Sequence, residues 1–369
     1  MKAAIMGRSM RPPLTGIGRY TRNLVTHLAP LVSPESLTLF VTRESDILHA
    51  PGIRTVAAPL PTPHEAFRAA WEHSVVPYQA LRTGLDVYHS PNYTLPLILG
   101  CASVVTVHDL AFLDPRFHNR RLQLYLRLLT KRSLKAATRV IAVSEYTKRQ
   151  VEERYPFIAG KVSVVYSGLD PSFLPEEAPA SSQSNGRRPY ILFVGSVEPR
   201  KNLPRLIRAF ERAVQGSGLP HELVLCGPWG WRYDNVIAAL DRSPVRDRIR
   251  RVGYMPSNEL RELYAHADLL AYPSLDEGFG FPILEAMSTG TPVVTADRGA
   301  PPEISGGAAV TVDPTSVSAI TEALERVLTD RALATELAEK GRLRAGQFSW
   351  KRAAEQTLAV YQEAMEAHR

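Results

Sequence analysis

Cysteines and long apolar runs are scarce in this 369-residue chain. The two cysteines, Cys101 and Cys226, lie far apart and form no Cys-x-x-Cys motif, which indicates neither a disulfide framework nor a zinc site. No apolar run approaches the about 20 residues that a membrane-spanning helix requires. The amino-terminal segment turns polar at Arg8, so it predicts a first β-strand and not a signal peptide. From these absences we expect a cytoplasmic protein.

Charge is unevenly distributed between the two halves of the chain. Residues 1–170 carry 21 Lys and Arg against 12 Asp and Glu, whereas residues 171–369 carry 23 against 25. The basic half is therefore expected to meet an anionic partner such as phosphate, a lipid head group or nucleic acid. Nucleic acid is the weakest of these, because no aromatic residues are interleaved with the basic ones and no known module is present.

Short β-branched runs alternate with helical patterns, which predicts an α/β fold with parallel sheets covered on both faces. The length fits two domains, and residues 171–189 read as a linker between Rossmann-like domains at 1–170 and 190–349. Ligands bind at the carboxyl ends of parallel strands, so two facing sheets would place a site in an interdomain cleft. Strands are expected at 2–6, 37–42, 53–57, 86–89, 103–107, 139–143, 162–166, 190–194, 222–226, 249–253, 268–272 and 292–296, and helices at 17–29, 65–82, 119–137, 145–155, 203–215, 257–266, 281–289, 315–329, 331–346 and 350–366.

The segment from Tyr272 to Ala286 is the most informative. A buried strand ends near Tyr272 and a helix begins near Pro282, and the glycines between them let backbone amides approach a ligand. The helix amino terminus favours a phosphate, whereas the acids Glu277 and Glu285 favour hydroxyl groups. A sugar nucleotide offers both. The alternative is that Glu277 is a solvated loop acid and Glu285 lies on a helix surface.

A second cluster follows the strand at 190–194. Arg200 and Lys201 lie after its carboxyl end, where two cations suit a diphosphate leaving group, and Asn202 can cap the next helix. An exposed basic turn is the alternative.

Two motifs in the first half are weaker. Gly16 and Gly18 form half of a dinucleotide fingerprint that lacks its third glycine and its ribose-binding acid. His108 ends an apolar strand, where it either contacts a substrate hydroxyl or has a structural role. The helix expected at 119–137 mixes leucines with basic residues, which fits either an anionic lipid surface or ordinary core packing.

Taken together, these segments resemble the retaining glycosyltransferases of the GT-B fold, specifically family 4 and its mannosyltransferase-like branch. The resemblance covers nearly the whole chain. Glu277 to Glu285 matches the family's E-x7-E motif. Further matches are the segments 143–147, 166–170, 194–196, 200–202 and 253–256, while 89–92 with 108–110 resembles the branch that uses GDP-mannose.

The resemblance implies a role for each site residue. Arg200 and Lys201 would bind the donor diphosphate, Glu285 the ribose, Glu277 the sugar hydroxyls, and His108 would lie beside the reacting sugar. The final helix, 350–369, would cross back to the first domain. The remaining donor-binding positions are Gly16 and Gly18 in a loop near the diphosphate, the amides of Gly278, Phe279 and Gly280 beside sugar and phosphate, Tyr254 in the loop that meets the base, and also Ser196 and Ile283.

The resemblance implies hexose transfer with retained configuration, most simply mannose from GDP-mannose, to a glycan or lipid-linked acceptor in envelope polysaccharide synthesis. No Asp-x-Asp sequence is present, so we expect neither a metal nor another cofactor, because the two cations and helix dipoles can do the same electrostatic work. The basic half could place the enzyme at the inner face of the cell membrane. The alternatives are a UDP-sugar donor, an NAD-dependent dehydrogenase, a sugar-nucleotide epimerase or a non-catalytic binding module.

Overall fold

The computed structural model describes residues 1–12, 14–42, 52–58, 65–117, 120–173 and 188–369, without the side chains of 65–70, 120–122 and 125. Its contacts divide the chain into two compact units, Met1–Gly168 with Ser349–Arg369, and Leu169–Phe348. Most of the predicted linker, residues 174–187, lies outside the described residues.

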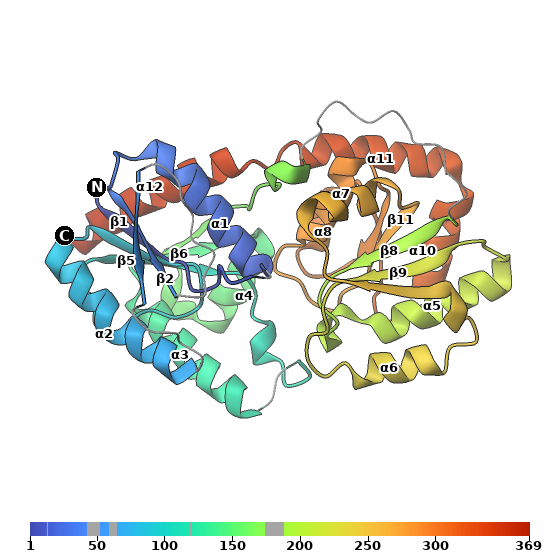
Figure 1. The fold of residues 1–369 in the computed structure, drawn as a ribbon, viewed down its shortest axis with the longest axis horizontal. Coiled ribbons are helices and arrows are strands. Elements are labelled where there is room, and N and C mark those ends of the chain that lie inside the picture. The colour runs from blue at the N-terminus through green and yellow to red at the C-terminus, as the bar shows by residue number, and fades with distance from the viewer. Residues whose placement is uncertain (13, 43–51, 59–64, 118–119, 174–187) are drawn as a thin grey trace. The chain divides into compact units, whose positions relative to one another are not determined.

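The first unit is a seven-stranded parallel sheet with the strand order β3-β2-β1-β4-β5-β6-β7 (Figure 1). Helices α1 and α12 pack together on one face, where α12 contacts β4, β5 and β6. Side chains of α2, α3 and α4 join the apolar core on the other face. The elements are β1 (Ala3–Met6), α1 (Gly16–Leu28), β2 (Leu37–Val41), β3 (Ile53–Ala57), α2 (Glu65–Thr83), β4 (Val87–Ser90), β5 (Ala102–Val107), α3 (Arg120–Ala136), β6 (Arg139–Ala142), α4 (Glu145–Arg154), β7 (Val162–Val164) and α12 (Trp350–His368).

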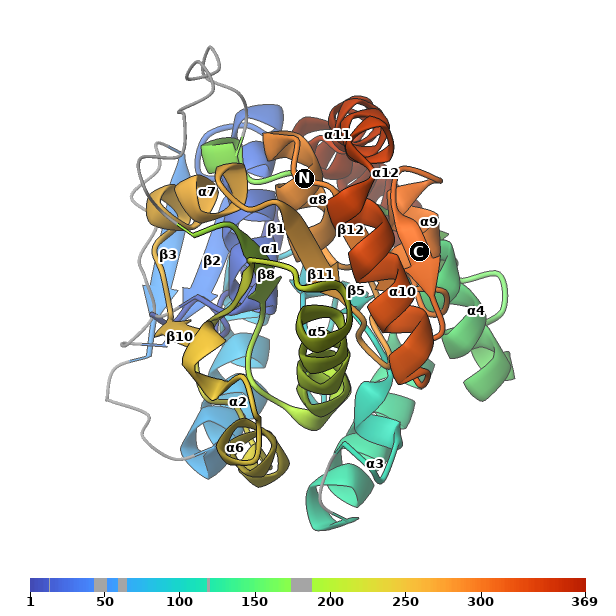
Figure 2. The ribbon, with the colours of Figure 1, turned by 90° about the vertical axis from the view of Figure 1, so that its right-hand side faces the viewer.

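The second unit is a six-stranded parallel sheet with the order β10-β9-β8-β11-β12-β13. Helices α5, α6 and α10 pack side by side on one face (Figure 2). Helices α7 and α11 each contact α8. The elements are β8 (Tyr190–Val194), α5 (Leu203–Ser217), β9 (Glu222–Cys226), α6 (Asp234–Asp241), β10 (Ile249–Gly253), α7 (Ser257–Ala265), β11 (Leu269–Tyr272), α8 (Phe281–Thr289), β12 (Val293–Ala296), α9 (Pro301–Ser305), β13 (Val310–Val312), α10 (Val317–Thr329) and α11 (Arg331–Ala345).

These two parallel sheets confirm the predicted α/β class. Strand β8 shows why its continuous apolar run predicts a strand. All five of its residues are buried, as expected when helices cover both faces of a parallel sheet. Helix α5 buries Leu203, Leu206, Ile207 and Phe210, which recur at helical spacing. The structure also contains α6, α9 and β13, which the sequence patterns do not predict. These elements have eight, five and three residues, too few for a clear period.

A buried polar network attaches the C-terminal helix α12 to the first sheet. His89 of β4 lies 2.7 Å from the Tyr361 hydroxyl through Nδ1 and 2.8 Å from the Thr106 hydroxyl through Nε2. Tyr20 of α1 reaches the same Thr106 hydroxyl at 3.2 Å. All four side chains are almost fully buried. Each polar atom named here has a partner, so the network links α1, α12 and two strands without leaving a buried group unsatisfied.

We predict that acid weakens the first unit through His89. Burial, followed by the nearby His108, lowers the pKa of His89 from 6.5 to about 3. Folded His89 therefore stays neutral where the unfolded chain takes up a proton, so its contribution to the free energy of unfolding is complete above pH 6.5 and decreases as the pH falls toward 3. The slope for one such group is about 1.4 kcal/mol per pH unit.

Urea unfolding at pH 8, 6 and 5 measures this slope. The variant His89→Gln should show a shallower decline than the wild type, whereas His368→Gln, at the exposed end of α12, should follow the wild type. Equal slopes for His89→Gln and the wild type would contradict the assignment.

Candidate active site

In the second sheet, β8 and β11 are neighbours although β9 and β10 lie between them in sequence. This is the point where the strand order reverses, and in open α/β sheets ligands bind outside the carboxyl ends of the strands at such a point. The segment after β8 carries Arg200 and Lys201, and the loop after β11 carries Glu277. The Leu275 amide donates to the Arg200 carbonyl oxygen at 2.8 Å, which fastens the two loops together.

Glu277 is the centre of the cluster formed there. Its Oε1 accepts hydrogen bonds from Lys201 Nζ at 2.6 Å and from the Tyr272 hydroxyl at 2.9 Å, and its Oε2 accepts one from Arg200 Nη1 at 2.5 Å. Lys201 Nζ also lies 2.5 Å from the Tyr272 hydroxyl. Glu277 is 6% exposed and Lys201 7%. The alternative of a solvated loop acid is therefore wrong for Glu277.

The charges of this cluster explain its pKa shifts. Burial alone would raise the pKa of Glu277, but the charges of Arg200 and Lys201 outweigh it and lower that pKa to about 2. Burial lowers the pKa of Lys201, and the Glu277 carboxylate opposes that shift. We take Lys201 as an ammonium and Glu277 as a carboxylate at neutral pH, because the 2.6 Å distance between Lys201 Nζ and Glu277 Oε1 fits a charge-assisted hydrogen bond. Burial and Glu277 raise the pKa of Tyr272, so its hydroxyl keeps its proton.

Arg200 extends the cluster towards the loop after β9. Its Nη2 donates to Glu198 Oε1 at 2.8 Å, and the second oxygen of Glu198 accepts from the Trp231 indole at 3.2 Å. The Arg200 side chain is 16% exposed, more than the 9% of the Lys201 side chain. Arg200 is thus the cation of the pair with more of its surface available to a ligand.

Helix α8 begins immediately after this loop. Its N-cap residue, Gly280, has φ of 111°, a conformation that favours glycine, and as a glycine it supplies no capping side chain to the helix amino terminus. Phe279 and Ile283 are buried beside it, and Gly278 precedes them in the same loop. Such a helix end favours an anion.

Glu285 lies one turn into α8 and is 1% exposed. Its Oε2 accepts a hydrogen bond from the Tyr264 hydroxyl of α7 at 2.9 Å. Glu285 therefore does not lie on a helix surface, which removes the other alternative left open by the sequence.

Asn202 differs from its predicted role. It precedes α5 but has φ of 62°, and its side chain makes no capping hydrogen bond. Its amide nitrogen instead donates to the carbonyl oxygens of Pro273, at 2.9 Å, and Pro314, at 2.7 Å. Asn202 thus joins the loops after β8, β11 and β13, because its left-handed backbone turns the side chain away from the helix amides.

The other predicted residues of the second unit lie at its strand ends. Ser196 follows β8 and is partly buried. Tyr254 follows β10 and is 50% exposed, so its ring is accessible to a ligand.

The two glycines predicted for a loop in the first unit both lie in the first turn of α1. Gly16 is exposed with open space around it, whereas a Cβ on Gly18 would lie 2.5 Å from the Ser9 carbonyl oxygen. Gly18 is therefore required for the close approach of the Ser9 backbone to α1.

His108 follows β5 in the first unit and is held in a defined orientation. Its Nε2 lies 2.9 Å from the Pro91 carbonyl oxygen, and its ring packs edge-to-face on Tyr20 with 4.7 Å between centroids. Burial lowers the pKa of His108 to about 4 against the opposing effects of Pro91 and Asp109. Because a carbonyl oxygen only accepts, the proton of the neutral ring is on Nε2, which leaves Nδ1 as an acceptor.

Comparison with known proteins identifies the family. The model described as Glycosyltransferase Family 4 matches residues 14–173, and that described as Glycosyl transferases group 1 matches residues 175–344. O-antigen chain mannosyltransferase B of Escherichia coli is 32% identical over 382 residues, covering 98% of this chain and 99% of that protein. This chain belongs to glycosyltransferase family 4.

Solved structures agree on the fold of this glycosyltransferase. Sucrose-phosphate synthase from Thermosynechococcus elongatus matches with a TM-score of 0.81 and 21% identity, covering 99% of each chain. Anabaena Alr3699/HepE in complex with UDP and glucose matches with a TM-score of 0.75 and 19% identity, covering 97% of this chain and 98% of that one. At these identities the likeness shows the GT-B fold alone.

Sequence reasoning about this glycosyltransferase missed three polar partners of its candidate site, namely Tyr272, Glu198 and Tyr264. Tyr272 carried a signal, because it is the last residue of a buried strand and lies five residues before Glu277. Glu198 carried a local signal, because it lies two residues before Arg200, its ion-pair partner. Tyr264 gave none, since its contact with Glu285 depends on the packing of α7 against α8. Among the described residues, no group of three or more His, Cys, Asp or Glu side chains could hold a metal ion.

We predict strong coupling between Lys201 and Glu277. Each single variant, Glu277→Gln or Lys201→Met, leaves a buried charge with less compensation and should lower the free energy of unfolding by about 3 kcal/mol. The double variant should lose less than the sum, with a coupling of about 1–3 kcal/mol in urea unfolding. The exposed pair Glu336 and Lys340 of α11, changed in the same way, serves as the control and should show a coupling of less than about 0.5 kcal/mol. Additive losses at Lys201 and Glu277 would contradict the buried ion pair.

Proposed function

We propose that this glycosyltransferase transfers mannose from GDP-mannose to a glycan or lipid-linked glycan acceptor, with retained anomeric configuration and without a metal. The observation that carries the proposal is the buried cluster of Arg200 and Lys201 around Glu277 at the strand-order reversal of the second sheet. The family membership supplies the reaction class. The named activity of the Escherichia coli relative, an O-antigen chain mannosyltransferase, supports mannose and envelope polysaccharide synthesis.

Electrostatics suggest how the cluster would serve this reaction. Breaking the bond between the sugar and the diphosphate leaves negative charge on the leaving group, and preorganised cations stabilise it without reorganisation. Arg200 and Lys201 are held in place by Glu277 before any ligand arrives. We infer that they bind the diphosphate together with the amino terminus of α8, which is how the reaction would proceed without a metal.

The low pKa of Glu277 limits its role. A carboxylate with a pKa of about 2 is a weak base at neutral pH, so we infer that Glu277 positions the two cations and accepts hydrogen bonds from sugar hydroxyls. Retaining hydrolases use a nucleophilic carboxylate with a second carboxyl group as acid about 5–5.5 Å away. We infer instead that the acceptor hydroxyl attacks the anomeric carbon on the face that the diphosphate leaves, so that its oxygen bonds to this carbon as the bond to the phosphate oxygen breaks, and that its proton passes to the departing diphosphate. Glu285 would bind the ribose, and His108 Nδ1 would accept a hydrogen bond from the reacting sugar.

We expect calorimetric titration with GDP, UDP, ADP and NAD, in buffer without divalent metal, to show tight binding of GDP. Lys201→Met should weaken that binding by about tenfold or more, because it removes one charge-assisted contact with the diphosphate. Lys340→Met, an exposed lysine of α11, is the matched control and should bind like the wild type.

Each other result of the titration has a defined meaning. Preference for UDP would indicate a UDP-sugar as the donor. The structure of HepE in complex with UDP and glucose supports that alternative. Binding of NAD alone would support a dehydrogenase. Wild-type affinity in Lys201→Met would remove this lysine from the diphosphate site. If the donor is GDP-mannose, the anomeric configuration of the product formed in EDTA then tests retention and metal independence.

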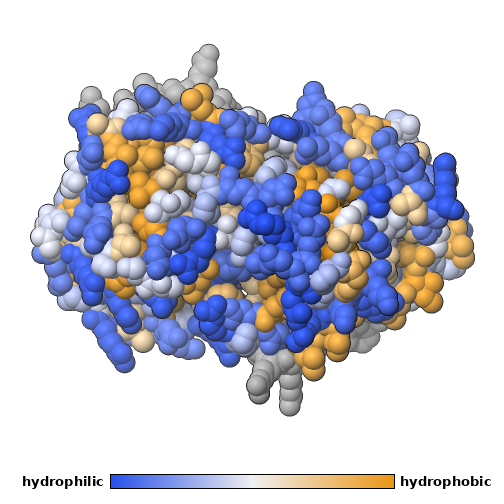
Figure 3. Space-filling view, turned by 180° about the vertical axis from the view of Figure 1, so that it is seen from behind, coloured by the Kyte–Doolittle hydropathy of each residue, from blue (hydrophilic) through white to orange (hydrophobic). Residues whose placement is uncertain are grey.

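An acceptor attached to a lipid requires contact with a membrane, and we propose a surface on α3 for it. No described helix is long and apolar enough to cross a bilayer, and Figure 3 shows one face of the molecule with mostly hydrophilic side chains and separate hydrophobic patches. On α3, Leu124 is 58% exposed and Leu128 60% exposed. Arg127 and Lys131 are exposed on the same helix, and such a combination favours anionic lipid.

We predict that the wild type cosediments with vesicles containing phosphatidylglycerol and that Leu124→Ser with Leu128→Ser weakens this binding several-fold, because less apolar surface enters the interface. Leu343→Ser on α11, a leucine 75% exposed, is the control and should have no effect. An α3 double variant that binds like the wild type would show that the alternative, ordinary packing of α3 with a solvated basic face, is correct.

A further inference from the structure

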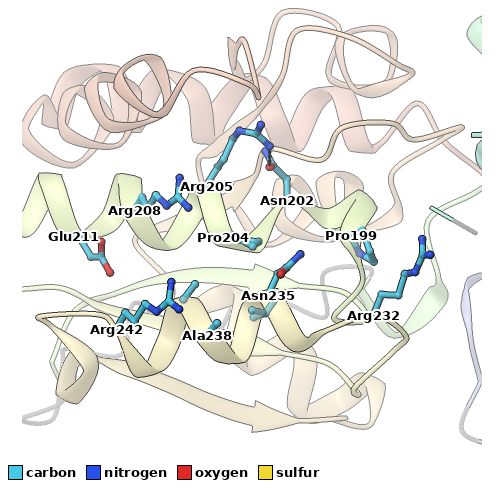
Figure 4. A pocket seen from close by; sticks show the side chains of 12 residues that line it. Pro199, Asn202, Pro204, Arg205, Arg208, Glu211, Arg232, Asn235, Ala238 and Arg242 are labelled. Carbon is cyan, nitrogen blue, oxygen red and sulfur yellow. Dashed lines mark hydrogen bonds between the residues drawn. The ribbon is translucent and has the colours of Figure 1, made fainter. Parts of the chain in front are cut away.

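A cavity opens between α5 and α6 of the second unit (Figure 4). Its volume is about 560 Å³. The two helices are neighbours on one face of the sheet, and Figure 4 shows Asn235 of α6 and Arg242, the residue after this helix, projecting towards α5. Pro199, Pro204 and Val236 contribute apolar surface to the lining.

The charged residues that line the cavity are mostly arginines. Arg205 and Arg208 come from α5, Arg232 and Arg242 flank α6, and Glu211 is the acid among the lining residues. Arg208 and Arg242 are exposed, and neither forms an ion pair with any carboxylate in the described part of the chain. Arg205 donates to the Asn202 side-chain oxygen at 2.9 Å, and its charge also acts on the Asp313 carboxylate, whose pKa it helps to lower.

This concentration of positive charge does not follow from the composition of the second half, which carries slightly more acids than bases over residues 171–369. Guanidinium groups of like charge repel one another, so placing four arginines around one cavity has a cost that a bound anion would offset. Arginine is also the side chain whose planar donors match phosphate oxygens in pairs.

The cavity is separate from the Glu277 cluster. It lies between α5 and α6, whereas α8, which carries Glu285, packs with α7 and α11. Lys201 directs its amine to Glu277 and Tyr272. Asn202 stands between the two sites: its amide nitrogen binds the loops after β11 and β13, and its oxygen faces Arg205.

We propose that the α5–α6 cavity binds a ligand bearing phosphate groups, as a site distinct from that of the donor. Arg208 and Arg242 would hold the phosphate oxygens from opposite helices, and Arg205 and Arg232 would add to the local positive potential. The apolar lining accommodates a non-polar part of the ligand. A soluble phosphorylated compound and a phospholipid head group share this chemistry.

Calorimetric titration of the full chain with inorganic pyrophosphate tests the site. Arg208→Gln with Arg242→Gln should weaken pyrophosphate binding by about tenfold or more, since two charge-assisted contacts are removed. The matched control is Arg212→Gln with Arg326→Gln, two exposed arginines of α5 and α10 that lie outside the cavity. Thermal unfolding of each variant verifies that it is folded. Pyrophosphate also fits the proposed donor site, so the titrations are made with and without Lys201→Met. Lys201→Met should lose binding at the donor site alone and keep the binding event that the cavity variant loses, which separates the two sites whether or not the proposed function holds.

Two results would overturn the proposal: wild-type affinity in the cavity variant, or an equal loss in the cavity and control variants, which would indicate general surface charge. Cosedimentation with phosphatidylglycerol vesicles, against phosphatidylcholine vesicles, distinguishes the sources. Loss of vesicle binding in the cavity variant assigns the site to a lipid head group. Loss of pyrophosphate binding with unchanged vesicle binding assigns it to a soluble phosphate ligand.

Discussion

One buried carboxylate organises the candidate active site of this glycosyltransferase. Glu277 accepts hydrogen bonds from Lys201, Arg200 and Tyr272. Without it the buried Lys201 would lose its ion-pair partner and Arg200 would keep only Glu198. A buried charge is costly unless it is paired and hydrogen-bonded. The cluster therefore holds positive charge in a fixed position at the point where an anionic ligand is expected, and it keeps that charge tolerable in the absence of the ligand.

The order of the strands in the second sheet makes this cluster possible. Lys201 and Glu277 are 76 residues apart, and they meet because β11 inserts beside β8 and not beside β10. In a parallel sheet with right-handed crossovers, every loop that follows a strand lies at the same edge of the sheet. Of those loops, only the pair on either side of the strand-order reversal diverges to opposite faces, which leaves room for a ligand between them.

Local patterns predicted the fold class and singled out Arg200, Lys201 and Glu277, which the structure brings together, but they did not predict how these residues pair. Continuous apolar runs such as 190–194 indicated buried strands, and the glycines before Pro282 indicated a ligand-binding helix end. The contact of Tyr264 with Glu285 could not be predicted, because it is set by the packing of α7 against α8. Asn202 shows the limit most clearly: its residue type is typical of a helix cap, yet a left-handed backbone directs its amide to two distant carbonyl groups. No local pattern encodes that choice, since it depends on loops up to 112 residues away.

Charge is the property for which summing over the sequence misleads most. The first half is basic and the second is slightly acidic, yet both the cationic pair at Glu277 and the arginines of the α5–α6 cavity belong to the second half. The net charge of a segment includes charged groups that lie far apart in the folded chain. The electrostatic potential at a site depends instead on charges within about one Debye length of it. In α5, the apolar positions face the sheet at helical spacing and fix Arg205 and Arg208 on the side that faces the cavity. The same apolar pattern that folds the helix therefore also determines where its positive charge can act.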